Sequence, residues 1–273
     1  MEKVQEKYMI KDGLVQPSET EFELPEGKGI YIFEVIRVIS GIPLFLDEHL
    51  QRLQLSIFKS DFNFRINREG LETDIYKLIN SNQVRIGNLK IVIRLADKNI
   101  NTWLYFIPYS YPSPEEYLSG VELGILHAER LNPEAKTIQP KVRETASQFF
   151  RTESDYEVLL IDQNGFIREG SRSNVFFIKG DKVYTPPADQ VLNGITRCKV
   201  IDILETGCCE FEEVPVLLDD LKSFDGIFIT GTSPKVLSVK QAGSVVFNPQ
   251  HPVYLEILKR YDQLINGYIS KHL

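Results

Sequence analysis

The sequence predicts a mixed α/β protein with two domains. Runs rich in β-branched and aromatic residues alternate with amphipathic helical patterns, as expected for strands and helices in one chain. At 273 residues the chain is longer than a typical single domain, and a stretch with three prolines at 108–119 separates two sets of elements. We therefore predict a small α/β domain at 1–112, a linker at 113–119 and a larger domain at 120–273.

The first set of elements begins with a predicted strand at 29–39. The Ser40-Gly41 pair then indicates a hairpin into a second strand at 42–46. Asp47 is expected to cap a helix that runs through Ser56, because aspartate is a favoured N-cap residue. The remaining elements of this set are predicted as a helix at about 67–81 and strands at 89–95 and 102–108.

The second set of elements mixes strands, a hairpin and helices in the same way. The turn residues Lys179-Gly180-Asp181 between two short apolar runs indicate the hairpin. In chain order we predict a strand at 121–126, a helix at about 142–152, a strand at 157–162, the hairpin strands at 175–178 and 182–185, and a helix at 196–205.

Composition excludes several classes of function. The net charge of −7 and the pI near 5.3 argue against nucleic acid or an anionic membrane as a partner. No apolar run is long enough to cross a bilayer, and the N-terminus lacks the apolar core of a signal peptide, so we expect a cytoplasmic protein. The three cysteines, Cys198, Cys208 and Cys209, form no Cys-x-x-Cys, and neither a disulfide framework nor a metal site is expected.

Two segments of the second domain carry the strongest chemical signal. The first, EGSRSNVF at 169–176, places the carboxylate of Glu169 before a turn of small polar residues. The second, LNGITR at 192–197, places a glycine before a predicted helix, where unpaired amides and the helix dipole favour an anion. Alone, a turn glutamate is usually solvent-exposed and such a glycine is usually only a cap, so the pair of segments matters more than either one.

Together these segments resemble the signatures of the class IV aminotransferases, and the resemblance extends from about residue 29 to residue 233. It implies a fold type IV architecture, with a small α/β domain and a larger domain that has a β-barrel-like core. It also implies pyridoxal 5'-phosphate as cofactor, an amino acid and a 2-oxo acid as substrates, and a homodimer. Such a cofactor needs a lysine for the Schiff base, an acid at its ring nitrogen and an anion site for its phosphate.

The resemblance assigns a role to each matching residue. Lys136, in the Lys-Thr pair at 136–137, is the candidate catalytic lysine. Glu169 is expected to pair with the ring nitrogen, and Phe33 and Arg94 to line the substrate pocket. The other expected cofactor-binding residues, mostly phosphate ligands, are Arg52 of EHLQRL (48–53), Ser173, Asn174, Gly194, Ile195, Thr196, Gly231, Thr232 and Ser233.

Several alternatives stay open at this point. Lys141 is the rival for the Schiff-base lysine, and Gln139-Pro140 departs from the family pattern next to it. The reaction is expected to be transamination of a branched-chain or D-amino acid. An aminodeoxychorismate lyase, which releases pyruvate and 4-aminobenzoate, and a non-catalytic relative that only binds the cofactor are the alternatives.

Overall fold

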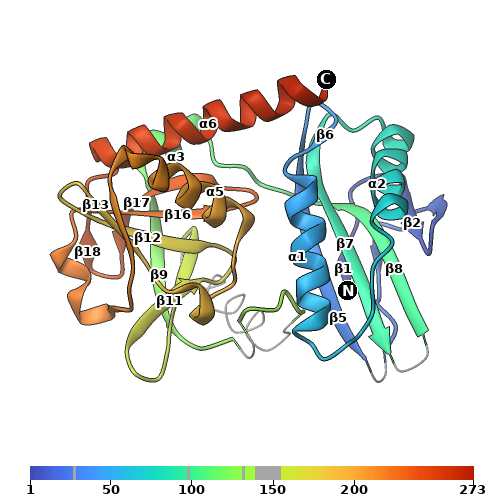
Figure 1. Ribbon diagram of the computed structural model, residues 1–273, viewed down its shortest axis with the longest axis horizontal. Helices are drawn as coiled ribbons and strands as arrows, with labels where there is room; N and C mark the ends of the chain where they lie inside the picture. The colour runs from blue at the N-terminus through green and yellow to red at the C-terminus, as the bar shows by residue number, and fades with distance from the viewer. Residues whose placement is uncertain (27–28, 97–98, 131–132, 139–154) are drawn as a thin grey trace. The chain divides into compact units, whose positions relative to one another are not determined.

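The computed structural model describes residues 1–26, 29–96, 99–130, 133–138 and 155–273. The chain divides into two compact units: unit 1 contains residues 1–110, 135–138 and 265–273, and unit 2 contains residues 111–134 and 139–264. Each unit has a sheet with helices (Figure 1), so the predicted mixed α/β class is confirmed. Among the described helices, none combines the length and apolar character that crossing a membrane requires.

Unit 1 is built on a six-stranded antiparallel sheet with the order β3-β2-β8-β7-β5-β6. The two long strands β5 and β7 pair along their whole length, from Ile30 opposite Leu95 to Ile39 opposite Ile86. The strands of the sheet are β2 (Tyr8–Lys11), β3 (Leu14–Pro17), β5 (Ile30–Ile39), β6 (Ile42–Pro43), β7 (Ile86–Ala96) and β8 (Asn99–Ile107). The strands predicted near 29–39, 89–95 and 102–108 are therefore confirmed.

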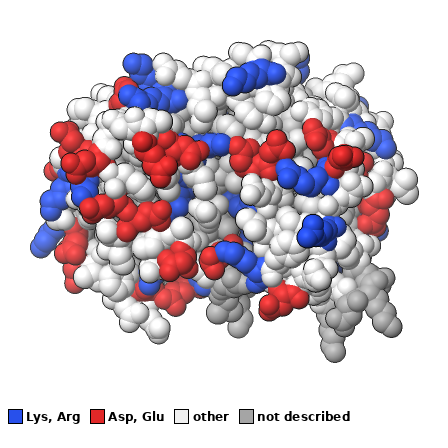
Figure 2. Space-filling model, viewed as in Figure 1, with Lys and Arg blue, Asp and Glu red and all other residues white. Residues whose placement is uncertain are grey.

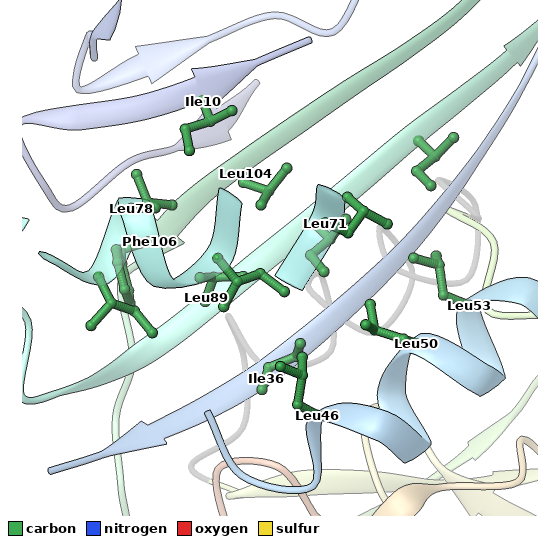
Figure 3. Packing of buried hydrophobic residues seen from close by; sticks show 14 of the residues in the cluster. Ile10, Ile36, Leu46, Leu50, Leu53, Leu71, Leu78, Leu89, Leu104 and Phe106 are labelled. Carbon is green, nitrogen blue, oxygen red and sulfur yellow. The ribbon is translucent and has the colours of Figure 1, made fainter. Parts of the chain in front are cut away.

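Two helices cover one face of this sheet. Helix α1 (Leu46–Phe58) runs alongside β5 and β7 (Figure 1), and α2 (Arg68–Asn82) lies beside it on the same sheet. Figure 3 shows that Leu50 and Leu53 of α1 point toward β5. Ile36, a residue of β5 in the same cluster, is fully buried. Burial of each such side chain contributes about 1.5–3 kcal/mol, which explains why the apolar stripe of α1 faces the sheet.

The start of α1 differs from the prediction. Asp47 lies within the first turn, and the N-cap is Phe45, which has a positive φ of 53° and provides no side-chain cap. The Phe45 ring packs edge-on against Tyr268 at 5.0 Å, and the Tyr268 hydroxyl accepts the Leu46 N–H at 3.3 Å. A buried aromatic contact therefore sets the helix start, and Asp47 only complements the helix dipole.

The other face of the sheet is covered by the N-terminal residues. The short strands β1 (Glu2–Lys3) and β4 (Glu21–Phe22) pair with each other, and Phe22 packs edge-on against Tyr105 at 5.1 Å. Lys90 is 3% exposed, and its Nζ lies 2.6 Å from Oε2 of Glu2. The N-terminus therefore neutralises a buried lysine on β7, as a buried charge requires.

Unit 2 contains a ten-stranded sheet in which β18 pairs with β17, and the other strands follow the order β14-β13-β12-β16-β17-β9-β10-β11-β15. The pairs β9·β10, β9·β17 and β13·β14 are parallel, and the others are antiparallel. The strands are β9 (Val121–His127), β10 (Glu157–Ile161), β11 (Phe166–Gly170), β12 (Asn174–Lys179), β13 (Lys182–Thr185), β14 (Glu210–Glu213), β15 (Val216–Leu217), β16 (Gly226–Gly231), β17 (Lys235–Ala242) and β18 (Val245–Val246). The predicted hairpin of β12 and β13 is confirmed.

The helices of unit 2 include two that were not predicted from the sequence. Residues 114–119 of the expected linker form the short helix α3 (Pro114–Ser119), which begins with a capping box between Ser113 and Glu116. Helix α6 (Pro252–His272) ends the chain, with residues in both units. Helix α5 (Ile195–Ile203) matches the prediction and continues into a π-helical turn at Leu204–Cys208. The helix predicted at 142–152 lies outside the described residues.

Acidic and basic side chains are interspersed over the face of the molecule in Figure 2. The 38 acidic and 31 basic residues give the net charge of −7. Several exposed ion pairs account for the mixture, such as Lys240 with Glu122 at 2.9 Å in unit 2.

Candidate active site

Lys136 lies in an extended segment along the edge of β5 in unit 1. The Phe33 N–H donates to the Lys136 carbonyl at 3.0 Å, and the Ile138 N–H donates to the Tyr31 carbonyl at 2.9 Å. Between them, Ile32 and Thr137 form an isolated antiparallel bridge. Residues 136–138 therefore act as a short extra strand, and sheet hydrogen bonds fix the backbone of the predicted catalytic lysine.

The side chain of Lys136 lies over the ring of Phe33. Its Nζ is 4.7 Å from the ring centroid, a distance at which a cation is attracted to an aromatic face. The Lys136 N–H donates to Oγ of Ser56 at 3.2 Å, and Ser56 is a buried residue of α1. Sequence reasoning named Lys136 and Phe33 for different roles, and the structure brings them into contact.

Glu34 is the centre of a buried charge cluster on α1 and β5. Its Oε1 accepts from Nε of Arg52 at 2.7 Å, and its Oε2 accepts from Nη2 of Arg52 at 2.6 Å. Oε2 also lies 2.8 Å from Nδ1 of His49. Burial by itself would raise the pKa of Glu34, but the Arg52 charge and the hydrogen bonds from Arg52 and His49 lower the pKa to about 2. Two nitrogens of Arg52, predicted as a phosphate ligand, are thus directed at Glu34.

His49 connects this cluster to Lys136. Burial lowers the pKa of His49 below its ordinary value, and Glu34 opposes this shift. The positive charges of Arg52 and Lys136 lower the pKa of His49 further.

The two predicted substrate residues lie on the sheet face that carries no helix. Arg94 of β7 is paired in register with Tyr31 of β5, and Phe33 is paired with Val92. Burial raises the pKa of Tyr31, whereas the charge of Arg94 opposes that shift, so the two side chains are neighbours. Phe33 contacts a second cation, because Nζ of Lys90 lies 5.3 Å from its ring centroid.

Glu169 of β11 is a buried carboxylate of unit 2, with 4% of its side chain exposed. Its Oε1 lies 2.9 Å from Nε of Arg130, which follows β9. Its Oε2 accepts the Leu192 N–H at 3.2 Å and the Asn174 amide at 3.4 Å. The structure therefore connects Glu169 with Asn174 and with the loop that leads into α5.

A pocket of about 230 Å³ in unit 2 is lined in part by Glu169. Glu169 and Arg130 line it together with Arg168, whose guanidinium donates to Asp162 and to Gln190. The full lining is Ala128, Glu129, Arg130, Pro133, Leu160, Arg168, Glu169 and Gln190. A concave site with a few convergent polar groups is typical of small-molecule binding.

Helix α5 begins at the predicted anion site without a side-chain cap. Gly194 is its N-cap residue, with φ −64° and ψ 139°, and a glycine supplies no side-chain cap for the first turn. Ile195 and Thr196 are 8% and 6% exposed, which limits access of water to these amides. Buried amides at an uncapped helix start favour an anionic partner because of their partial positive charge.

Three segments meet beside this helix start. Asn174 of β12 is the cross-strand partner of Thr230 of β16, so both side chains lie on one face of the sheet. A Cβ on Gly194 would lie 2.2 Å from Oδ1 of Asn174, which shows how closely the α5 cap packs on β12. A Cβ on Gly231 would lie 3.5 Å from the Arg172 carbonyl, so the predicted turn 231–233 borders the loop after Gly170.

Two hydroxyls near these segments are buried, and neither has a hydrogen-bond partner within the described residues. They are Oγ of Ser173 and Oγ1 of Thr230. Ser173, a predicted cofactor contact, packs its hydroxyl against Gly170. Thr230 shares its face with Asn174, and a buried hydroxyl there that no described residue pairs with is a candidate contact for a ligand.

Some residues of the site were not found by sequence reasoning. Glu34 adjoins Phe33 in the strand motif, and Thr230 adjoins Gly231, so their positions in the motifs were the only signal. No sequence pattern indicated Arg130, because this residue belongs to no motif and contacts Glu169 only in the folded protein. Lys141, the rival lysine, lies outside the described residues, and so does Gln139-Pro140.

Comparison with known proteins identifies the relatives of this chain. Residues 31–242 match the amino-transferase class IV family. A D-alanine aminotransferase from Bacillus licheniformis is 28% identical over 249 residues, which cover 85% of this chain and 87% of that protein. The fold matches a branched-chain amino acid aminotransferase from Escherichia coli with a TM-score of 0.84 at 22% identity, covering 97% of this chain and 96% of that one.

A second branched-chain amino acid aminotransferase, from T.th., was solved with pyridoxamine 5'-phosphate. It matches with a TM-score of 0.82 at 22% identity, again over 97% of this chain and 96% of that one. These neighbours confirm the fold type IV architecture that the sequence predicted.

Proposed function

The chain belongs to the class IV aminotransferase family, and on this premise we propose that it transfers an amino group between an amino acid and a 2-oxo acid, with pyridoxal 5'-phosphate as cofactor. One observation carries the proposal. The buried carboxylate of Glu169 faces a pocket and is tied through the Leu192 N–H to the loop that begins the uncapped helix α5. A cofactor that is cationic at one end and phosphorylated at the other needs this combination.

The residues of unit 2 fit this cofactor. The buried hydroxyl of Thr230, which has no partner among the described residues, and the amides of Ile195 and Thr196 at the start of α5 are donors of the kind that a phosphate needs. We propose that these groups, with the turn Gly231-Thr232-Ser233, bind the phosphate, and that Asn174 and Ser173 hold the surrounding loops. The Asn174 amide already contacts both Glu169 and the Leu192 carbonyl, which supports this role.

The bound cofactor supplies an aldehyde and an electron-withdrawing ring that stabilises negative charge at the substrate Cα. Glu169 holds the proton on the ring nitrogen by ion pairing. We propose that Lys136 would hold the cofactor through Nζ, and that this amine, once the amino group of the substrate has displaced it, would move the proton at the substrate Cα. The backbone hydrogen bonds of residues 136–138 to β5 orient this amine.

Unit 1 supplies the proposed substrate contacts. Phe33 lies beneath Nζ of Lys136, so its ring would form an apolar wall beside the reacting Cα. Arg94 offers a planar cation that suits a carboxylate. Arg52 is proposed to contribute positive charge toward the phosphate, although two of its nitrogens bind Glu34.

The visible absorption spectrum tests the proposal. The purified protein loaded with pyridoxal phosphate should absorb in the visible range, and an accepted amino acid should bleach that band. Lys136→Ala should lack the band, whereas Lys141→Ala, the matched control, should keep it. A band that survives in Lys136→Ala but disappears in Lys141→Ala would move the assignment to Lys141.

The substrate follows from a panel measured in the same way. We propose a branched-chain or D-amino acid, in line with relatives that are a D-alanine and a branched-chain aminotransferase. Bleaching by D-alanine but not by L-leucine would indicate a D-amino acid as substrate. Bleaching by L-leucine but not by D-alanine would indicate a branched-chain amino acid. Formation of 4-aminobenzoate from aminodeoxychorismate would instead assign lyase activity, and bound cofactor without any half-reaction would assign a non-catalytic relative.

We also propose that the protein is a homodimer, as the sequence resemblance implies, and that it is cytoplasmic, as its sequence pattern leads us to expect. Sedimentation equilibrium tests the assembly, with an expected mass of twice 31.4 kDa. A monomer that keeps full activity would contradict it.

A further inference from the structure

The contact between Arg130 and Glu169 joins two charges inside unit 2. Nε of Arg130 lies 2.9 Å from Oε1 of Glu169, with only 18% and 4% of the two side chains exposed. Other ion pairs among the described residues lie in solvent, for example Arg260 and Glu256 at 2.7 Å with 38% and 42% of the side chains exposed. Water screens the exposed pair, and it screens the buried pair much less.

Arg130 is held by a second contact to the same loop. Its Nη2 donates to the Ser171 carbonyl, two residues after Glu169. The guanidinium therefore contacts both the carboxylate and the backbone that follows it. Two contacts from one planar group fix its position more firmly than a single ion pair.

Arg130 contacts Glu169 mainly as a charge. The Nε–H of Arg130 is not aligned with Oε1 for a hydrogen bond, although the atoms are 2.9 Å apart. Glu169 also lines the pocket, and its Oε2 accepts the Leu192 N–H and the Asn174 amide. The carboxylate is therefore held by contacts on both of its oxygens.

From this arrangement we propose that Arg130 is a positioning residue that keeps Glu169 ionised and fixed in the pocket. The inference rests on the proposed function, because the partner of Glu169 is then the ring nitrogen of the cofactor. Burial favours the protonated form of a carboxylate, and a protonated Glu169 would leave the ring nitrogen without its proton. Arg168, which also lines the pocket, donates to Asp162 and Gln190, whereas Arg130 contacts Glu169. Because Arg130 contacts the Glu169 carboxylate, its positive charge stabilises the ionised form of Glu169. An ionised Glu169 in turn favours the protonated ring nitrogen.

The ring nitrogen itself reports on this role. Pyridoxamine phosphate labelled with 15N in the ring is bound to the wild type, Arg130→Gln, Arg130→Lys and Arg260→Gln, and the 15N chemical shift and the dissociation constant are measured. We expect a protonated ring in the wild type and in Arg260→Gln, which loses an exposed pair of the same kind. Arg130→Gln should shift toward the unprotonated ring and bind about tenfold more weakly or worse, and Arg130→Lys should restore most of both values.

Other results overturn the inference. A protonated ring and unchanged affinity in Arg130→Gln would show that the charge is not needed. Equal losses in folded Arg130→Gln and Arg130→Lys would show that the shape of the side chain matters and its charge does not. If the wild type does not bind pyridoxamine phosphate, the proposed function fails, which is a different result from failure at Arg130.

The proposal can also be tested if Arg130→Gln is unstable. The proposal attributes such a defect to the unpaired charge of Glu169, so the double variant Arg130→Gln with Glu169→Gln should recover stability in urea unfolding. A double variant that is as unstable as Arg130→Gln would contradict the proposal.

Discussion

Arg52 binds Glu34 side-on, with Nε and Nη2 on separate carboxylate oxygens at 2.7 and 2.6 Å. Glu34 is fully buried, and Arg52 is 9% exposed. Neither charge can be left alone in such surroundings without a large cost in free energy. The pair therefore connects β5 to α1 at the level of the Lys136 segment.

Removal of the carboxylate should strongly destabilise the fold. Glu34→Ala leaves Arg52 buried without its partner, and we expect the free energy of unfolding to fall by about 3–5 kcal/mol. Asp47→Ala is the control, because it removes the exposed pair with Arg68 at 2.9 Å and should cost at most about 1 kcal/mol. Urea unfolding measures both, and equal losses in the two variants would contradict the buried-pair interpretation.

The stability of the protein should depend on pH through Glu34. Its pKa is about 2 in the folded protein and near 4.5 in the unfolded chain, so the unfolded state binds more protons between these values. The contribution is complete above pH 4.5 and is lost as the pH falls toward 2, to a total of about 3 kcal/mol. Unfolding in urea between pH 6 and 3 should show a steeper decline for the wild type than for Glu34→Gln. Parallel declines would refute this assignment.

The hydrogen bond from Ser56 should influence the Lys136 segment. Ser56→Ala leaves the Lys136 N–H without this acceptor, which we expect to cost about 1 kcal/mol. Loading with pyridoxal phosphate should be slower or weaker, because the lysine backbone is less firmly held. Ser270→Ala is the control, since its hydroxyl bonds an exposed carbonyl within α6. If Ser56→Ala loads like the control, this hydrogen bond does not position the lysine.

Two glycine substitutions should have opposite effects. Gly194→Ala places a Cβ 2.2 Å from Oδ1 of Asn174, so we expect a loss of about 1–3 kcal/mol and weaker cofactor binding. Gly267→Ala meets nothing within 4 Å on α6 and should stabilise the protein by about 0.5–1 kcal/mol. Thermal unfolding with and without pyridoxal phosphate distinguishes them. A Gly194→Ala variant with wild-type affinity would show that Asn174 can move without loss.

Local patterns predicted the long strands and the hairpin well. β5, β7 and the pair of β12 and β13 are rich in β-branched and aromatic residues, which makes their type evident. The short strands β1 to β4 contain two to four residues each, which is too few for a period to appear. Helix α6 did contain a signal, because Tyr254, Ile257, Tyr261 and Ile265 are buried at helical spacing.

The site residues that belong to sequence motifs could be predicted. The residues that reach the site from other parts of the chain could not. Glu169 and Gly194 stand in recognisable segments, and the structure connects both through Asn174. The partners Arg130 and Ser56 come from other elements, and their contacts arise only when the chain folds. Phe45 illustrates the same limit, since a contact with Tyr268 near the C-terminus decides where α1 begins.

The segment 136–138 gives β5 a hydrogen-bonded neighbour where β6 does not reach, because β6 pairs only with Val38 and Ile39. An open strand edge is a template for association with other chains. The residues that present the lysine thus also guard unit 1 against aggregation. A substitution that loosens this segment to alter catalysis would therefore lower solubility as well. The activity and the solubility of this protein thus depend on the same three residues.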